Sequence, residues 1–199
     1  MQPQLKIVPT LEKLTSKSFP VVSFIKGLSF TLVDLSDAPE MLAGLLDGPT
    51  PDAALDEGWG GGSVGCLFFK GLEMDEVEGE PAIRNLQARF FAQGREQQAS
   101  STAASALSCY LALNTQFIST TTNKDDVDAA LAEQTESMKL SGKAVRKVFG
   151  IQTGAEVGRR CTIAVEVDIE VDDAGKSTVK SVILSGRANF GMRGELIPT

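Results

Sequence analysis

The sequence predicts an α+β fold, in which a sheet of mixed or antiparallel strands packs on one buried helix. Residues Cys161 to Val171 alternate between apolar and polar side chains, as is typical of a strand with one buried face. Residues Ala103 to Leu113 carry almost no charge on any side, and a helix that is apolar all round lies inside a protein. Strand patterns occupy much of the remaining chain, so this helix is expected in the core.

The other strands are expected from alternation and from the turn residues between them. Lys26 and Gly27 indicate one hairpin turn, and Asp172 to Gly175 indicate a second. The expected strands are Lys6 to Val8, Pro20 to Ile25, Leu28 to Leu35, Val64 to Phe69, Ile83 to Phe91, Val145 to Gln152, Cys161 to Val171 and Thr178 to Leu184.

Three helices are expected. The central one runs from about Ser100 to Leu113, with Ser100, Ser101 and Thr102 as candidate N-caps. Ala38 to Leu46 has helical spacing of apolar residues, with Asp37 as its cap. A third helix, Lys124 to Met138, is amphipathic. Residues 48 to 65, rich in glycine and proline, are expected to form a loop.

Length and charge limit the classes of function. We expect residues 1–199 to form one domain. The net charge of −7 argues against nucleic acid or an anionic membrane as a partner, because both require a basic surface. No segment approaches the ~18 apolar residues of a membrane span, and the N-terminus lacks the features of a signal peptide. A cytoplasmic protein is therefore expected.

The chain contains no histidine, which excludes Ser–His and Cys–His nucleophiles and the usual zinc sites. Cys66, Cys109 and Cys161 lie far apart in apolar stretches. Buried free thiols are favoured for them over a disulfide or a metal site. Acid–base chemistry is left to Glu, Asp, Tyr, Lys, Cys or bound water, and neither a metal nor an organic cofactor is expected.

The segment from Gly94 to Ser101, before the central helix, is the first candidate for a site. A helix N-terminus presents free N–H groups and a positive dipole end to an anionic or enolate-like ligand. Glu96 is the only carboxylate there and the default acid–base group; the alternative is a structural charge at the helix start, paired with Arg95. The candidate catalytic residues are Glu96 and Gln97, and the candidate substrate-binding residues are Arg95, Gln98, Ser100, Ser101, Thr102 and Trp59.

Two further segments contain several glycines. Gly58 to Gly65 superficially fits GxGxxG, but it lies outside a βαβ unit, so dinucleotide binding is rejected. Trp59 within it is a candidate to cover a ligand, and the alternative is that it packs the loop. In the turn Gln152 to Arg160, Glu156 and Arg159 either reach a cleft or are solvated.

Residues 95 to 111 resemble the signature of the phenazine-biosynthesis PhzF-like family, relatives of diaminopimelate epimerase. The usual form is Glu-Asp-Pro-x-Thr-Gly-Ser-Ala, followed by an apolar helix ending near a Tyr-Leu pair. Glu96 stands at the Glu, Gln97 at the Asp and Ser100 at the Thr. The segments Val21 to Leu35, Gln152 to Arg160 and Gly186 to Leu196 also resemble the family, so the match covers most of residues 20 to 197.

The resemblance implies a diaminopimelate-epimerase-like domain, a sheet curled around a central apolar helix, and identifies the chain as a fungal-type second domain. The family's first domain, which carries its catalytic Glu, is absent. Gln97 replaces the Asp implied in proton transfer and cannot carry a proton between two sites. A half-site of this kind implies a homodimer that restores the pocket through an isologous interface.

The function expected is a cofactor-independent isomerase or cyclase of secondary metabolism, acting on an aromatic or polyketide intermediate by proton transfer and oxyanion stabilisation. Two alternatives are open. One is a non-catalytic small-molecule-binding protein that keeps the pocket. The other is a subunit that pairs with a separate first-domain chain, or a truncated piece of a longer protein.

Overall fold

The computed structural model describes residues 19–48, 55–59, 63–75, 81–114, 145–172 and 175–186. The expected strand Lys6 to Val8 and the expected helix Lys124 to Met138 lie outside these ranges, as does most of the segment Gly186 to Leu196. No helix within the described ranges is long and apolar enough to cross a membrane.

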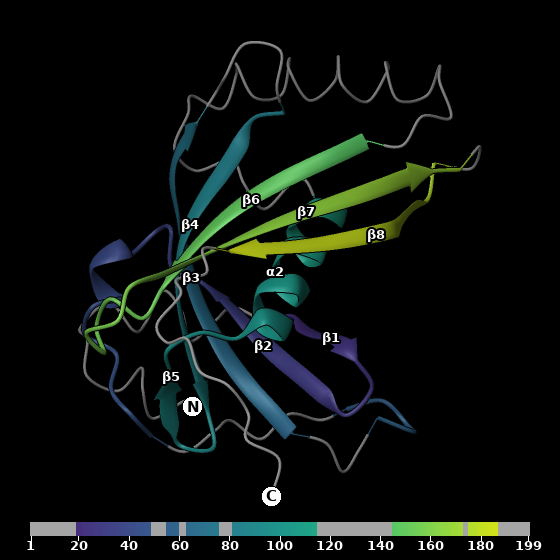
Figure 1. Ribbon diagram of the computed structural model, residues 1–199. Coiled ribbons are helices and arrows are strands. Elements are labelled where there is room, and N and C mark those ends of the chain that lie inside the picture. Colours follow the sequence, from purple (N-terminus) through teal and green to yellow (C-terminus); the bar gives the residue numbers. More distant parts are fainter. Residues whose placement is uncertain are drawn as a thin grey trace, which may run out of the picture.

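An eight-stranded mixed sheet forms most of the described structure, and it curls around one helix (Figure 1). Along the sheet the order is β1-β2-β3-β4-β6-β7-β8, and β5 pairs with β4 off this path. The pairs β2–β3 and β4–β6 are parallel, and the other pairs are antiparallel. The strands are β1 (Val21–Ile25), β2 (Leu28–Asp34), β3 (Ser63–Asp75), β4 (Ile83–Ala92), β5 (Arg95–Gln97), β6 (Val145–Thr153), β7 (Cys161–Val171) and β8 (Ser177–Gly186).

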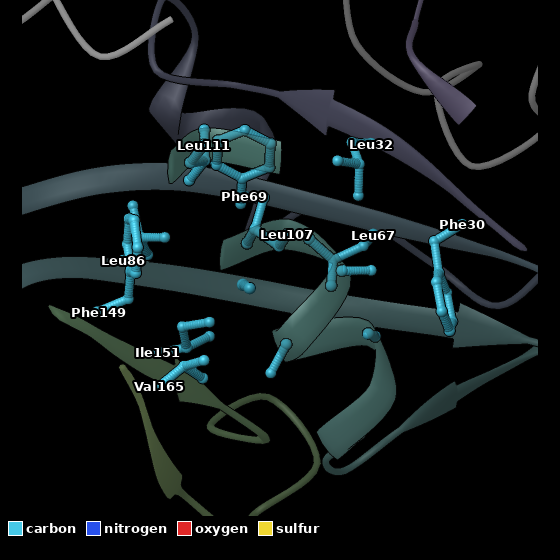
Figure 2. Close-up of a cluster of buried hydrophobic side chains, with 14 of the residues drawn as sticks. Phe30, Leu32, Leu67, Phe69, Leu86, Leu107, Leu111, Phe149, Ile151 and Val165 are labelled. Carbon is cyan, nitrogen blue, oxygen red and sulfur yellow. The ribbon is translucent and has the colours of Figure 1, made fainter. Parts of the chain in front are cut away.

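The helix α2 (Ser101–Leu113) lies inside the curl, between the edge strands β1 and β8 (Figure 1). Leu107 is fully buried among residues from β2, β3, β6 and β7, as Figure 2 shows. The inward face of β7 consists of Val165, Val167 and Ile169, in agreement with the alternation in the sequence. The predicted α+β class, a mixed sheet curled around a central apolar helix, is confirmed.

A second, smaller core covers the convex face of the sheet. It includes Cys66, Phe68 and Phe91 from β3 and β4, packed under Met41 and Leu42. All three cysteines are free thiols, and Cys66 is the most deeply buried of them.

The helix expected over Ala38 to Leu46 is wrong. Only a 3₁₀ helix, Pro39–Met41, forms there, and its N-cap is Ala38 without any side-chain cap bond, not Asp37. The carbonyls of Leu42 and Ala43 accept hydrogen bonds from Arg89 of β4. An α-helix ending at Leu46 would direct the carbonyl of Leu42 to the amide of Leu46, so for this carbonyl the tertiary contact replaces the helical one.

Candidate functional site

A tight hairpin carries the first candidate residues. β4 and β5 are joined by Gln93 (φ 52°) and Gly94 (φ 79°), and positive φ at both central positions is the requirement of a type I′ turn. The segment expected to be a loop is therefore partly a strand. Its register pairs Phe91 with Glu96 and Phe90 with Gln97.

This register places Glu96 and Gln97 on opposite faces, because residues directly opposite each other share a face of the sheet. Phe90 belongs to the core around α2, so Gln97 lies on the helix side. Phe91 belongs to the convex core, so Glu96 lies on the convex side. The two candidate catalytic residues are thus separated by the sheet.

Glu96 forms a buried, bidentate ion pair with Arg89. Arg89 Nε donates to Glu96 Oε1 at 2.9 Å and Arg89 Nη2 donates to Oε2 at 2.5 Å. Both side chains are 6% exposed. Arg89 Nη1 also donates to the carbonyls of Leu42 (2.8 Å) and Ala43 (3.2 Å). The partner of Glu96 is therefore Arg89, and the alternative pairing with Arg95 is wrong.

Neighbouring acids complete this cluster. The amide N–H of Glu96 donates to Asp47 Oδ1 at 2.7 Å. Glu156, in the turn after β6, accepts from Gln87 at 3.3 Å and has its Oε2 4.0 Å from Arg89 Nε. Glu156 is thus directed at the convex-side cluster, which joins the turn after β6 to the β4–β5 hairpin.

The N-terminus of α2 lies just beyond this hairpin. Ser100 is the N-cap, and its Oγ accepts from the amide of Ala103 at 3.2 Å, as predicted. Thr102 Oγ1 lies 3.2 Å from Ser100 Oγ. The first turn holds no acidic residue. Within the described ranges, the amides of Ser101 and Thr102 have no hydrogen-bond partner, so the positive end of the helix dipole is uncompensated there.

The other candidate residues differ in their surroundings. Gln98 Nε2 donates to the carbonyl of Arg159 at 3.3 Å, which ties the loop before α2 to the turn after β6. Arg95, Gln97 and Ser101 are exposed, and their side chains have no hydrogen-bond or ion-pair partner among the residues described. Trp59 is 38% exposed.

The structure therefore brings Gln97, Gln98, Ser100, Ser101 and Thr102 together along one short path into the helix. It does not bring Glu96 to the same side of the sheet. For Trp59, no hydrogen bond to this group is present in the described part of the chain.

Sequence analysis missed Arg89, the residue that holds Glu96. A signal was present, because Arg89 interrupts a strand that is apolar on both faces, with Ala88, Phe90 and Phe91 beside it. A charged residue is almost never fully buried unless it is paired. An arginine in such a strand therefore predicts a buried carboxylate partner, although not which one.

Comparison with known proteins gives only remote structural similarity. No protein-family model and no curated protein matches the chain. Among solved structures, the chain is similar to the crystal structure of the Bacillus anthracis phenazine biosynthesis protein of the PhzF family, with a TM-score of 0.34 and 11% sequence identity. The similar region covers 84% of this chain and 48% of that one, so the chain spans about half the length of that protein.

Proposed function

We propose that the N-terminus of α2 binds an oxygen that carries or develops negative charge, and that the protein is a cofactor-independent isomerase or cyclase of a small aromatic or polyketide intermediate. The observation that carries this proposal is the pair of unpartnered amides, of Ser101 and Thr102, at a helix start without acidic residues. Preorganised N–H donors that point at an oxygen on which negative charge develops stabilise the transition state. This electrostatic stabilisation is usually the largest single contribution to the rate enhancement in such reactions.

The surroundings of these amides favour an anionic group over a cation. Gln97 lies on the helix side of the hairpin, its side-chain amide has no partner among the described residues, and Arg95 is exposed two residues before it. Together with the helix dipole they give a locally positive region on a chain whose net charge is −7. Such a region selects a small anionic or enolisable ligand.

We assign Glu96 a positioning role, because both of its oxygens accept from Arg89 and it lies on the convex side. Its ion pair holds the hairpin that carries Gln97. An intramolecular cyclisation or isomerisation neither gains nor loses a proton overall, so a water molecule can accept the proton that leaves one atom of the substrate and return it to another. The chemistry then rests on oxygen binding by the amides and by Gln97.

The alternative, a non-catalytic small-molecule-binding protein, is favoured by one observation. The only carboxylate of the candidate segment is fully engaged in an ion pair. A binder needs only the helix N-terminus and Gln97, without any group that exchanges protons.

Replacing Gln97 by Glu tests both versions. A panel of aromatic and polyketide carboxylates and phenolates is screened by thermal shift and by product analysis. The variant adds a negative charge beside the helix start and removes a donor, so binding of the ligands that stabilise the wild type should weaken roughly tenfold. Leu46→Glu, the same added charge at a 56% exposed position away from both edge strands, is the control.

The outcomes separate the two functions. Turnover by the wild type, lost in Gln97→Ala while binding persists, supports an enzyme. Binding that depends on Gln97 without any product supports the binding protein. Equal binding by Gln97→Glu and Leu46→Glu would contradict a site at the N-terminus of α2.

We also propose that two copies of the chain associate and complete the pocket. Among the described strands, β1 and β8 are the two edges of the sheet, on either side of α2. Each edge exposes large apolar side chains, namely Val21, Phe24 and Ile25 on β1 and Ile183 and Leu184 on β8. Exposed apolar residues on open edges are typical of a surface that another chain covers.

Light scattering on the full chain at micromolar concentration should therefore give the mass of a dimer. Ile25→Lys, at an edge residue that is 49% exposed, should shift the mass toward that of a monomer. Leu46→Lys, at a 56% exposed position away from both edge strands, should leave the dimer intact. A monodisperse wild-type monomer contradicts the proposal.

A further inference from the structure

Two cations lie side by side at the other end of α2, on the concave face of the sheet. Arg84 of β4 is paired with Phe149 of β6, and Lys147 precedes Phe149 by two residues on the same strand. Because side chains alternate along a strand, Arg84, Lys147 and the buried Phe149 share one face. Lys147 Nζ donates to the carbonyl of Ala112, in the last turn of the helix, at 3.1 Å.

Neither cation has an acidic partner among the residues that the structure describes. The guanidinium of Arg84 makes no hydrogen bond or ion pair there, and its Nη1 is shielded from solvent. The buried arginine of β4, Arg89, is paired with Glu96, and the exposed Arg146 is paired with Asp168 and Glu166. Arg84 and Lys147 therefore differ from these two arginines in lacking a counter-charge within the described part of the chain.

The electrostatic consequence is visible in both groups. Burial and, to a smaller extent, the nearby charge of Arg84 together lower the pKa of Lys147 to about 8. Burial also lowers the pKa of Arg84. A half-buried cation without a counter-charge is costly, and here two of them repel each other.

The helix C-terminus compensates only part of this charge. It contributes about −0.5 of an elementary charge against the two positive charges of Arg84 and Lys147. Counting only the described residues, about 1.5 positive charges therefore remain; a carboxylate would lower this to about 0.5, and a phosphate group, with about −1.5 to −2, would neutralise it. The arginine fork binds two oxygens of such a group at once, and the ammonium group adds a third donor.

We propose that Arg84 and Lys147 bind the carboxylate or phosphate group of a small molecule at the C-terminal end of α2. This site is separate from the proposed oxyanion site, because the 13 residues of α2 place the two helix ends about 20 Å apart. The site therefore takes a second ligand or the remote acidic group of a long one.

The simplest rival explanation is that Lys147 only caps the helix. A lysine near the last carbonyls of a helix is common and mildly stabilising. This explanation accounts for the contact with Ala112, but it leaves Arg84 shielded and unpartnered. Helix capping alone also predicts that Lys147→Met lowers the stability of the ligand-free protein. An uncompensated cation pair predicts instead that Lys147→Met leaves this stability unchanged or raises it.

Thermal unfolding of the full chain with low-millimolar phosphate, succinate or sodium chloride, at equal ionic strength, tests the proposal. Phosphate or succinate should raise Tm by about a few degrees over chloride. In calorimetric titration, the affinity of Arg84→Gln and of Lys147→Gln for the anion should be lower than that of the wild type by roughly tenfold or more. Tighter binding of phosphate than of succinate would indicate a phosphate ligand, and the reverse order would indicate a carboxylate ligand.

Arg146→Gln is the matched control. Arg146 directly precedes Lys147 on β6 and is exposed, and its substitution removes the same charge from the other face of the sheet. It should leave anion binding unchanged. If Arg84→Gln fails to fold, Arg84→Lys keeps the charge without the fork and should bind with intermediate affinity.

Two results would overturn the proposal. One is the same stabilisation by phosphate and by succinate in the wild type and in Arg84→Gln, since general salt effects act on both proteins alike. The other is a less stable Lys147→Met protein together with no effect of added anions, which would mean that a carboxylate of the chain already neutralises the pair.

Discussion

Replacing Arg89 by Met should destabilise the protein by about 3–5 kcal/mol, the usual cost of removing one partner of a buried ion pair. The change leaves the Glu96 carboxylate, 6% exposed, without its counter-charge. It also leaves the carbonyls of Leu42 and Ala43 without their donor. The free energy of unfolding from urea titration measures the loss, and Tm should fall by about 6–20 °C.

Two further variants make this result specific. Arg146→Met removes an arginine with the same bidentate geometry, to Asp168, but one whose side chain is 47% exposed. Its effect on Tm should be small, because solvent screens such a pair. The double variant Arg89→Met/Glu96→Leu should be more stable than Arg89→Met alone, since no buried charge is left unpaired. Equal losses in Arg89→Met and Arg146→Met would contradict a structural role of the buried pair.

Gly154→Ala should cost about 2–5 kcal/mol, and it should also disturb the start of α2. Gly154 has φ +72°, where alanine is strained by about 1–2 kcal/mol. An added Cβ would lie 2.4 Å from the carbonyl oxygen of Arg159 and 2.9 Å from that of Gln98. Both atoms are backbone, so the turn or the loop must move, which typically costs about 1–3 kcal/mol more.

Gly158→Ala is the matched control for Gly154→Ala. Gly158 lies in the same turn with nearly the same φ, +75°, but an added Cβ would meet nothing within 4 Å. It should therefore cost only the backbone strain, about 1–2 kcal/mol. Urea titration of both variants measures the difference. If the two costs are equal, the close approach of the turn to Gln98 does not position the loop before α2.

Local pattern predicted most of the regular structure. The alternation in β7 and the hairpin turn before β8 are properties of consecutive residues, and so are the Ser100 cap and the uniformly apolar α2. These predictions agree with the structure because, in the described core, the apolar face that each pattern indicates is the face that is buried. Where local spacing competed with a tertiary contact, as for Ala38 to Leu46, the expectation failed.

The candidate site was predicted less completely than the fold. The sequence indicated the residues before α2, but adjacency in the chain does not tell which face of a strand each occupies. The turn at Gln93 and Gly94 converts the segment into β5, and this register separates Glu96 from Gln97. A shift of the β4–β5 register by one residue would place Glu96 on the helix side and Gln97 on the convex side.

The sequence by itself determined the fold class, the central apolar helix with its Ser100 cap, and the absence of histidine chemistry, because each depends on composition or on residues close in the chain. Only the tertiary structure decided that Glu96 pairs with Arg89, and that Arg84 and Lys147 meet at the end of α2. These contacts join strands whose register is set by the packing of the whole sheet. For that reason no local pattern encodes them.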